Sequence, residues 1–220
     1  MITLYGLPLS PFYNKVKIAL FEKGVNFEEV LVRPSQAPEV LQHSPMGKIP
    51  WVDINGVSLS ESTAIVEWLE DAYPTAALMP PTPNGRARVR QMMSMWDLYV
   101  VPACMPVTRH RIFGAPLDDA MRADAQAAIA RALKAVARLA RFTPWLVDEA
   151  FTLADAAAAG ALPMVELAGE VLGVDLLADL PGVGEYRQLL LRRQSVARSW
   201  SDRSAVLAQM LEQAAKQAMA

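Results

Sequence analysis

The sequence predicts a protein of two parts, a small α/β domain followed by a larger all-helical domain. Over the first 73 residues, short β-prone runs alternate with amphipathic helices in the order βαβ-α-ββ-α. Beyond this point strand patterns become rare and alanine-rich helical patterns replace them. Between the two parts, residues 74–85 contain four prolines and one glycine, a composition typical of a domain boundary. We therefore expect a first domain over residues 1–78, a linker over 79–85 and a helical domain over 86–220.

The first domain is expected to begin with a strand, a helix and a second strand. Residues 2–6 and 27–32 are the β-prone runs. In the helix between them, Ser10 suits the N-cap, Pro11 the first helical position and Gly24 the C-terminal stop. Because a whole helix separates the two strands, we expect them to pair in parallel.

A short helix near residues 37–44 and a β-hairpin are expected next. Asn55-Gly56 lies between two apolar runs, 51–54 and 57–59, and this dipeptide is a strong signal for a tight hairpin turn. Residues 62–72 place their apolar side chains on one helical face and predict the last helix of the first domain.

The second domain is predicted to contain helices at 86–111, 118–141, 153–168, 183–194 and 202–218. Pro102, Pro106 and Pro163 fall within these segments and are expected to kink or end them. Thr152 and Asp155 have the spacing of the N-cap and N3 residues of a capping box, so we assign both to folding rather than to chemistry.

Composition and charge exclude several classes of protein. The 21 basic and 23 acidic residues give a net charge of −2, unlike the basic surface of a nucleic-acid-binding protein. The apolar fraction of 53% excludes a disordered chain. One cysteine and two histidines are too few for a Cys/His zinc site or a disulfide framework. Without a signal peptide or a membrane-length apolar run, we expect a cytoplasmic protein with no membrane, metal or nucleic-acid partner.

Three short segments contain residues suited to binding a small polar ligand. At the first, the Ser10 hydroxyl lies at a helix N-terminus, where it can donate a hydrogen bond to an anion. At the second, Pro50 directly precedes a strand, and a cis Ile49–Pro50 bond would expose the Ile49 backbone. At the third, Glu61 can bind an ammonium group and Ser62 a carboxylate. Each has a simpler alternative: a structural cap at the first and third, and an ordinary trans proline at the second.

In this order and on this βαβ-α-ββ-α frame, the segments resemble those of cytosolic glutathione S-transferases of the serine type, similar to the bacterial, phi, tau, theta and zeta classes. Residues 10–20 (SPFYNKVKIAL) resemble the catalytic-serine segment of that family. Residues 44–50 (SPMGKIP) resemble its loop before the cis-proline, and residues 61–65 (ESTAI) resemble its γ-glutamyl-binding motif. Residues 151–155 (FTLAD) resemble the buried capping box of the family. The resemblance covers nearly the whole chain and implies a thioredoxin-like first domain, an all-α second domain and glutathione as co-substrate.

The resemblance also implies a role for each matching residue. The Ser10 hydroxyl would donate a hydrogen bond to the glutathione sulfur and favour the thiolate, which is the nucleophilic form. The backbone of Ile49, held by cis-Pro50, would pair with the cysteinyl backbone of glutathione. Glu61 and Ser62 would hold the γ-glutamyl end by its charged groups.

The glycyl end of glutathione is where this chain departs from the pattern. Some relatives have a basic pair near positions 35 and 36, where this chain has Ser35 and Gln36. Lys48 would then hold the glycyl carboxylate alone, or the carboxylate would be held more weakly; a solvated surface lysine is the alternative for Lys48. Two competitors for the catalytic role are set aside: Tyr5 is interpreted as a core residue and Cys104 as a small buried hydrophobe.

An apolar electrophile is expected to bind between the domains, in a pocket lined by Leu9, Phe12, Trp96, Tyr99, Met105 and Arg109, with Leu7 and His110 as further candidates. The alternative places Trp96 and Tyr99 in the core between helices and Arg109 in solvent. We therefore expect a homodimeric glutathione transferase that conjugates the glutathione thiolate to an apolar electrophile. A glutathione-dependent peroxidase or isomerase using the same site is one alternative, and a glutathione- or ligand-binding protein with little turnover is another, because one fold can host several chemistries.

Overall fold

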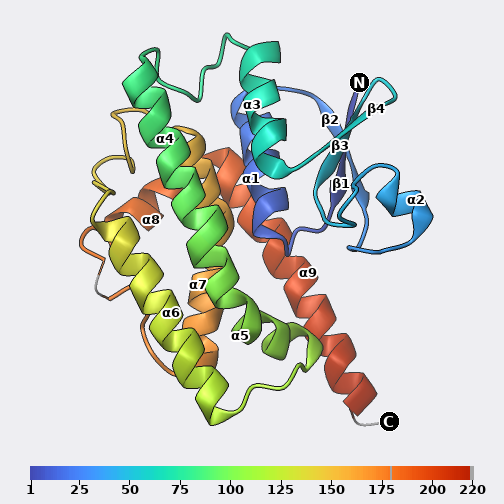
Figure 1. The fold of residues 1–220 in the computed structure, drawn as a ribbon, viewed down its shortest axis with the longest axis vertical. Helices are drawn as coiled ribbons and strands as arrows, with labels where there is room; N and C mark the ends of the chain where they lie inside the picture. The colour runs from blue at the N-terminus through green and yellow to red at the C-terminus, as the bar shows by residue number, and fades with distance from the viewer. Residues whose placement is uncertain (179, 219–220) are drawn as a thin grey trace.

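The computed structural model describes residues 1–178 and 180–218, in which a small sheet and its helices lie beside a bundle of longer helices (Figure 1). The sheet contains β1 (Ile2–Gly6), β2 (Phe27–Leu31), β3 (Trp51–Ile54) and β4 (Val57–Ser60) in the order β2-β1-β3-β4. Strand β1 pairs in parallel with β2 and antiparallel with β3, and β3 pairs antiparallel with β4. The predicted parallel pair and hairpin are thus confirmed.

The β3–β4 hairpin turns at the predicted Asn-Gly pair. Asn55 has φ 54° and Gly56 has φ 89°. Two consecutive positive φ values are what a two-residue turn of the right twist requires, and Asn followed by Gly accepts them at the lowest steric cost.

Helices α1 (Pro11–Glu22), α2 (Pro38–Leu41) and α3 (Ser62–Ala72) complete the first domain. Because side chains alternate along a strand, Leu4 and Val52 point to one face of the sheet, where they are buried in the same core as Ile65 of α3. Tyr5 and Trp51 point to the opposite face and their rings stack with 5.0 Å between centroids. Tyr5 is only half-buried there, which corrects its interpretation as a core residue.

The second domain contains α4 (Pro83–Met95), a π-helical turn η1 (Trp96–Val100), and the helices α5 (Val101–Phe113), α6 (Asp119–Ala137), α7 (Leu153–Leu172), α8 (Val183–Leu191) and α9 (Gln194–Ala218). The single helix expected at 86–111 is therefore two helices joined by a π turn, and it begins three residues early because Thr82 caps it. Helix α9 begins at Gln194 instead of residue 202. None of the helices that the structure describes is both long and apolar enough to span a membrane.

Pro163 does not end α7, contrary to one of the two outcomes expected for it. The helix continues to Leu172, although Pro163 has no N–H to donate to the carbonyl of Ala159. The indole Nε1 of Trp200 on α9 donates to that carbonyl instead, at 2.7 Å. The orphaned acceptor is thus satisfied from a neighbouring helix, and the proline is tolerated.

The predicted capping box begins α7 and is confirmed. The Asp155 carboxylate accepts from the Thr152 backbone N–H at 2.8 Å, and the Thr152 hydroxyl oxygen accepts from the N–H of Ala154 at 3.3 Å. The same buried carboxylate also accepts from the Leu146 N–H at 3.0 Å and the Tyr186 hydroxyl at 2.9 Å. One aspartate therefore ties the loop before α7 to α8.

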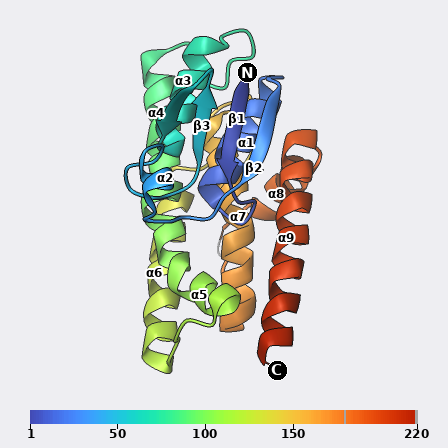
Figure 2. The same ribbon diagram turned by 90° about the vertical axis from the view of Figure 1, so that its right-hand side faces the viewer.

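The two domains meet where α1 lies against α7 (Figure 2). Gly160 of α7 lies at this contact, and a Cβ atom on it would lie 2.4 Å from the Pro11 carbonyl oxygen and 3.2 Å from the Lys15 backbone nitrogen. Only glycine allows the two backbones to approach so closely. The first turn of α1 is therefore seated directly on the helical domain.

Candidate functional site

Ser10 caps the N-terminus of α1 with a hydroxyl that retains its proton for another acceptor. Its Oγ accepts a hydrogen bond from the Tyr13 N–H at 3.3 Å. Its own N–H donates to the Leu7 carbonyl at 2.9 Å and closes the turn that connects β1 to α1. A serine hydroxyl is both acceptor and donor, so the capping bond leaves the O–H free to donate. Ser10 is half-buried and lies at the positive end of the helix dipole.

Ile49 and Pro50 directly precede β3 and lie next to the end of β1. The Ile49–Pro50 peptide bond is cis. Pro50 is buried, Ile49 is half-buried and Lys48 is exposed to solvent. A Cβ atom on Gly6, the last residue of β1, would lie 3.4 Å from the Cβ of Ile49, so the two backbones are neighbours.

Ser35 and Gln36, which occupy the position of the missing basic pair, hold the loop before Ile49. The Ser35 N–H donates to the Gly47 carbonyl at 3.0 Å, and the Gln36 side-chain amide donates to the Met46 carbonyl at 3.2 Å. Gly47 has φ 64°, and a Cβ on it would lie 2.1 Å from the Ser35 carbonyl oxygen. These two residues therefore fix the loop by close packing and supply no positive charge.

Glu61 has a backbone conformation that is rare for a residue with a side chain. Its φ is 69° and its ψ is 108°, and its exposed side chain makes no capping hydrogen bond to the described residues of α3. Such a conformation costs on the order of 1–3 kcal/mol and persists where the surrounding structure requires it. The alternative interpretation of this segment, as a structural cap of the helix, does not account for the Glu61 carboxylate, which is exposed and accessible to a ligand. Ser62, the first residue of α3, is buried.

Strand pairing places the three segments at one edge of the sheet. Tyr5 of β1 pairs with Trp51 of β3, and Trp51 pairs with Ser60 of β4. The turn to Ser10 follows the end of β1, Ile49 and Pro50 precede the start of the antiparallel β3, and Glu61 follows the end of β4. All three segments therefore leave the sheet from the same side.

A buried lysine that sequence patterns do not indicate ties this edge to the helical domain. Lys15 of α1 donates through Nζ to Asp97 of the π turn at 2.5 Å and to the Thr63 hydroxyl of α3 at 3.0 Å. Burial lowers the pKa of Lys15, and the neighbouring Asp97 opposes that shift. Both partners lie far along the chain, 48 and 82 residues away, so only the fold brings them together.

The six residues expected around an electrophile differ in their surroundings. Leu9, Phe12 and Met105 are half-buried, whereas Trp96 is wholly buried in the core and Arg109 is exposed. Tyr99 is 55% exposed, against the alternative that placed it in the core. Two hollows of about 220 and 140 Å³ lie in the helical domain, and none of the six residues lines either of them.

Cys104 is buried in the helical core, as expected for a small hydrophobe. Burial raises the pKa of its thiol to about 12, so the thiol is protonated near neutral pH and is not a nucleophile there. Among the residues that the structure describes, no three His, Cys, Asp or Glu side chains gather in the manner of metal ligands.

Two family models match the chain. Residues 4–80 match the model described as glutathione S-transferase, N-terminal domain, and residues 118–189 match the C-terminal domain of the same family. A glutathione S-transferase of Pseudomonas putida is 32% identical over 213 residues, which cover 96% of this chain and 97% of that protein. A maleylpyruvate isomerase of Ralstonia sp. is 34% identical over 96 residues, which cover 42% of this chain and 45% of that one.

Solved structures agree with these relatives. A glutathione S-transferase from Methylobacterium radiotolerans, in complex with glutathione sulfonate, has a TM-score of 0.77 at 31% identity and covers 90% of this chain and 93% of its own. A maleylpyruvate isomerase described as a bacterial zeta-class protein has a TM-score of 0.74 at 25% identity, with 90% and 95% covered. The βαβ-α-ββ-α domain and the helical domain predicted from the sequence are both confirmed.

Proposed function

This chain belongs to the glutathione S-transferase family, and we propose that its first domain binds glutathione and activates the thiol at Ser10 for attack on an apolar electrophile. The observation that supports this most is the Ser10 hydroxyl, which caps α1 through its oxygen and keeps its proton. The sheet edge around Ser10 also presents the Ile49 backbone and the Glu61 carboxylate.

The role proposed for Ser10 is to make the sulfur anionic. A hydrogen bond from its hydroxyl and the positive end of the α1 dipole both favour the thiolate over the thiol. Each unit by which the thiol pKa falls corresponds to about 1.4 kcal/mol of preferential stabilisation of the anion. With the proton already released to solvent, the sulfur forms its bond to the electrophilic carbon as the leaving group departs, and no general base is required.

The other residues are proposed to hold the tripeptide in place. The backbone of Ile49 before Pro50 pairs with the cysteinyl backbone, and Glu61 binds the γ-glutamyl ammonium group. Ser62 binds the γ-glutamyl carboxylate at the N-terminus of α3, where helix amides favour an anion. Lys48 is the exposed cation proposed for the glycyl carboxylate, since Ser35 and Gln36 hold the loop instead.

The electrophile is proposed to lie against half-buried apolar residues near Ser10. Leu9 and Phe12 flank Ser10 in the chain, and Met105 of α5 is also half-buried. The sulfur and the electrophile are held together there, so the reaction gains from proximity. Tyr99 and Arg109 stay proposed contacts at the exposed surface of this region, whereas Trp96 is assigned to the core.

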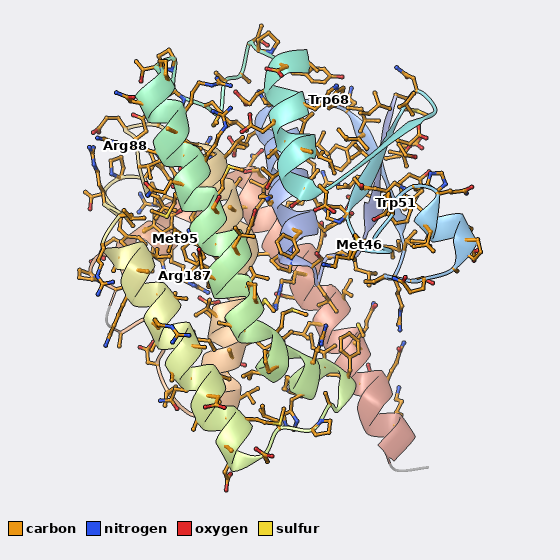
Figure 3. The ribbon with its side chains drawn as sticks, in the orientation of Figure 1. Met46, Trp51, Trp68, Arg88, Met95 and Arg187 are labelled. Carbon is orange, nitrogen blue, oxygen red and sulfur yellow. The ribbon has the colours of Figure 1, made fainter. Side chains whose placement is uncertain are left out.

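We also propose that the protein is a homodimer. Three exposed apolar residues lie on the loop before β3 and on the π turn: Met46 (62%), Leu98 (64%) and Tyr99 (55%). Val57 (69%) is exposed at the opposite end of the β3–β4 hairpin. Figure 3 shows Met46 beside the sheet. Contact with a second copy would remove this apolar surface from water. Sedimentation equilibrium tests the proposal, and the mass of a single chain at micromolar concentration would rule it out.

The cytoplasmic location expected from the sequence stays a prediction.

The function is tested with the purified chain, immobilised glutathione and three types of substrate. We expect retention on the matrix, elution by free glutathione, and conjugation of a dinitrophenyl halide. An isomerase is the second candidate, supported by the similarity to maleylpyruvate isomerases, in which case a maleyl substrate would be converted far faster. Turnover of an organic hydroperoxide alone would indicate a peroxidase. Retention without turnover of any substrate would favour a binding protein and contradict the proposed transfer.

Replacing Glu61 with glutamine is expected to weaken glutathione binding without slowing the chemical step. The change removes the charge that is proposed to bind the γ-glutamyl ammonium group, and loss of one charge-assisted hydrogen bond predicts a rise in the KM for glutathione of about tenfold. Glu67→Gln is the matched control, because Glu67 lies on α3, the helix that begins directly after Glu61, and is paired with Arg90 at 2.7 Å. Steady-state kinetics that show equal KM values for the two variants would contradict the role of Glu61.

A further inference from the structure

The turn that carries Ser10 is held by residues outside the proposed contacts with glutathione. We propose that Asn14 of α1 and Ser199 of α9 form a positioning pair, through which the C-terminal helix keeps Ser10 in place for thiol activation. This inference rests on the proposed function of Ser10. It assigns a role to two polar side chains that are buried between α1 and α9, with exposed fractions of 1% and 0%.

Asn14 holds the chain on both sides of Leu9 and Ser10. Its backbone N–H donates to the Ser10 carbonyl at 3.1 Å, as the first hydrogen bond of α1. Its side-chain Nδ2 donates to the Pro8 carbonyl at 2.8 Å. The second bond is absent from an ordinary helix start, and it ties the turn before Ser10 to the helix after it.

Ser199 fixes the orientation of the Asn14 amide. Its hydroxyl donates to Asn14 Oδ1 at 3.1 Å, across 185 residues of sequence. A flipped amide would place its oxygen against the Pro8 carbonyl, two acceptors with no proton between them. The hydroxyl of α9 and the carbonyl of Pro8 therefore select the same orientation, in which Nδ2 faces the turn.

The position of this turn matters because the Ser10 hydroxyl has to meet the sulfur at hydrogen-bonding distance. Apart from the Asn14 contacts, the turn is closed by the Ser10 N–H bond to the Leu7 carbonyl. A displacement on the order of 1 Å at a reacting centre can cost about a hundredfold in rate. If the Pro8 carbonyl were no longer held, the Ser10 hydroxyl and the backbone amides of the first turn of α1 would move away from the glutathione sulfur. The glutathione thiol would then be less acidic.

A second contact between α9 and α1 supplies a matched control. Asp202, three residues after Ser199, accepts from Lys17 Nζ at 2.7 Å, and Lys17 also donates to Glu29 of β2 at 2.6 Å. This ion pair joins the same two helices, but its hydrogen bonds go to Glu29 and Asp202 and not to the turn over residues 7–10. Loss of it would weaken the attachment of α9 and leave Pro8 held by Asn14.

The test compares Asn14→Leu, Ser199→Ala and Asp202→Asn in the full chain. Leucine has the length and branching of asparagine but no donor or acceptor, whereas Ser199→Ala removes only the bond from α9. For Asn14→Leu we expect the apparent pKa in the profile of kcat/KM against pH to rise by about one unit, with a rate about tenfold lower below that pKa. Above it, the rate should recover to the wild-type value. Ser199→Ala should shift the pKa in the same direction by less, and Asp202→Asn should lower the melting temperature with no shift.

Amide hydrogen exchange provides a readout that does not depend on turnover. The Ser10 amide should exchange faster in Asn14→Leu and Ser199→Ala than in Asp202→Asn, because the turn is loosened only in the first two. If both variants keep the wild-type pKa and the wild-type exchange rate at Ser10, the pair is merely structural and the proposal is overturned. Should Asn14→Leu fail to fold, Ser199→Ala alone decides between these results. A wild-type protein without glutathione-dependent turnover would count against the proposed function, while the exchange rates still decide whether the pair holds the turn.

Discussion

Replacing Ser10 with alanine is expected to lower kcat/KM for conjugation by about ten- to a hundredfold near neutral pH, while glutathione still binds. The substitution removes the donor proposed for the sulfur but leaves the Ile49 backbone and Glu61 in place. Loss of one or two units of thiol pKa depression accounts for that range, because only the thiolate fraction reacts. The thiol of the variant should ionise at higher pH, so its rate should approach the wild-type rate as the pH rises.

The loss of a helix cap has to be separated from the loss of a catalytic donor. Ser10 caps α1, so its removal should also cost about 0.5–2 kcal/mol of stability. Thr82 caps α4 in the same way, with its hydroxyl oxygen accepting from the Gly85 N–H at 3.1 Å. Thr82→Ala should therefore cost a similar amount of stability and leave kcat/KM unchanged. If pH–rate profiles and equilibrium binding show Ser10→Ala to be as active as Thr82→Ala, Ser10 has no part in the chemistry.

Local features of this fold can be predicted from the sequence because their causes lie within a few residues. The Asn55-Gly56 turn and the Thr152–Asp155 capping box each depend on a spacing of three residues or fewer, which the sequence displays directly. Ser10 followed by Pro11 likewise identifies the start of α1. Short-range patterns of the same kind also identified the three segments that form the proposed glutathione site.

Contacts between distant segments and an irregular helical turn could not be predicted from the sequence. The indole of Trp200 compensates for Pro163 from 41 residues beyond its acceptor, Ala159, and no pattern near Pro163 indicates this. The π turn over residues 96–100 adds an extra residue to its turn, so a helical face extrapolated across it is rotated. Trp96 consequently lies in the core while Tyr99 is exposed, although a continuous helix was expected to direct both toward one pocket.

Replacing Gly160 with alanine is expected to destabilise the protein by about 2 kcal/mol. An added Cβ would lie 2.4 Å from the Pro11 carbonyl oxygen, a backbone atom that cannot move without shifting α1. Overpacking of this kind typically costs about 1–3 kcal/mol or more. It outweighs the gain of about 1 kcal/mol that alanine brings over glycine inside a helix. Urea denaturation measures the difference in the free energy of unfolding.

Gly184 of α8 provides the control that isolates the contact from helix propensity. A Cβ on Gly184 would meet no atom within 4 Å, so Gly184→Ala should stabilise the protein by up to about 1 kcal/mol. Opposite signs for the two substitutions would show that the approach of α7 to α1 requires glycine at residue 160. If Gly160→Ala also stabilises the protein, α1 can withdraw from α7 at little cost in free energy. In that case Gly160→Ala should also leave the rate of conjugation unchanged, because the first turn of α1, which begins directly after Ser10, would not depend on its contact with the helical domain.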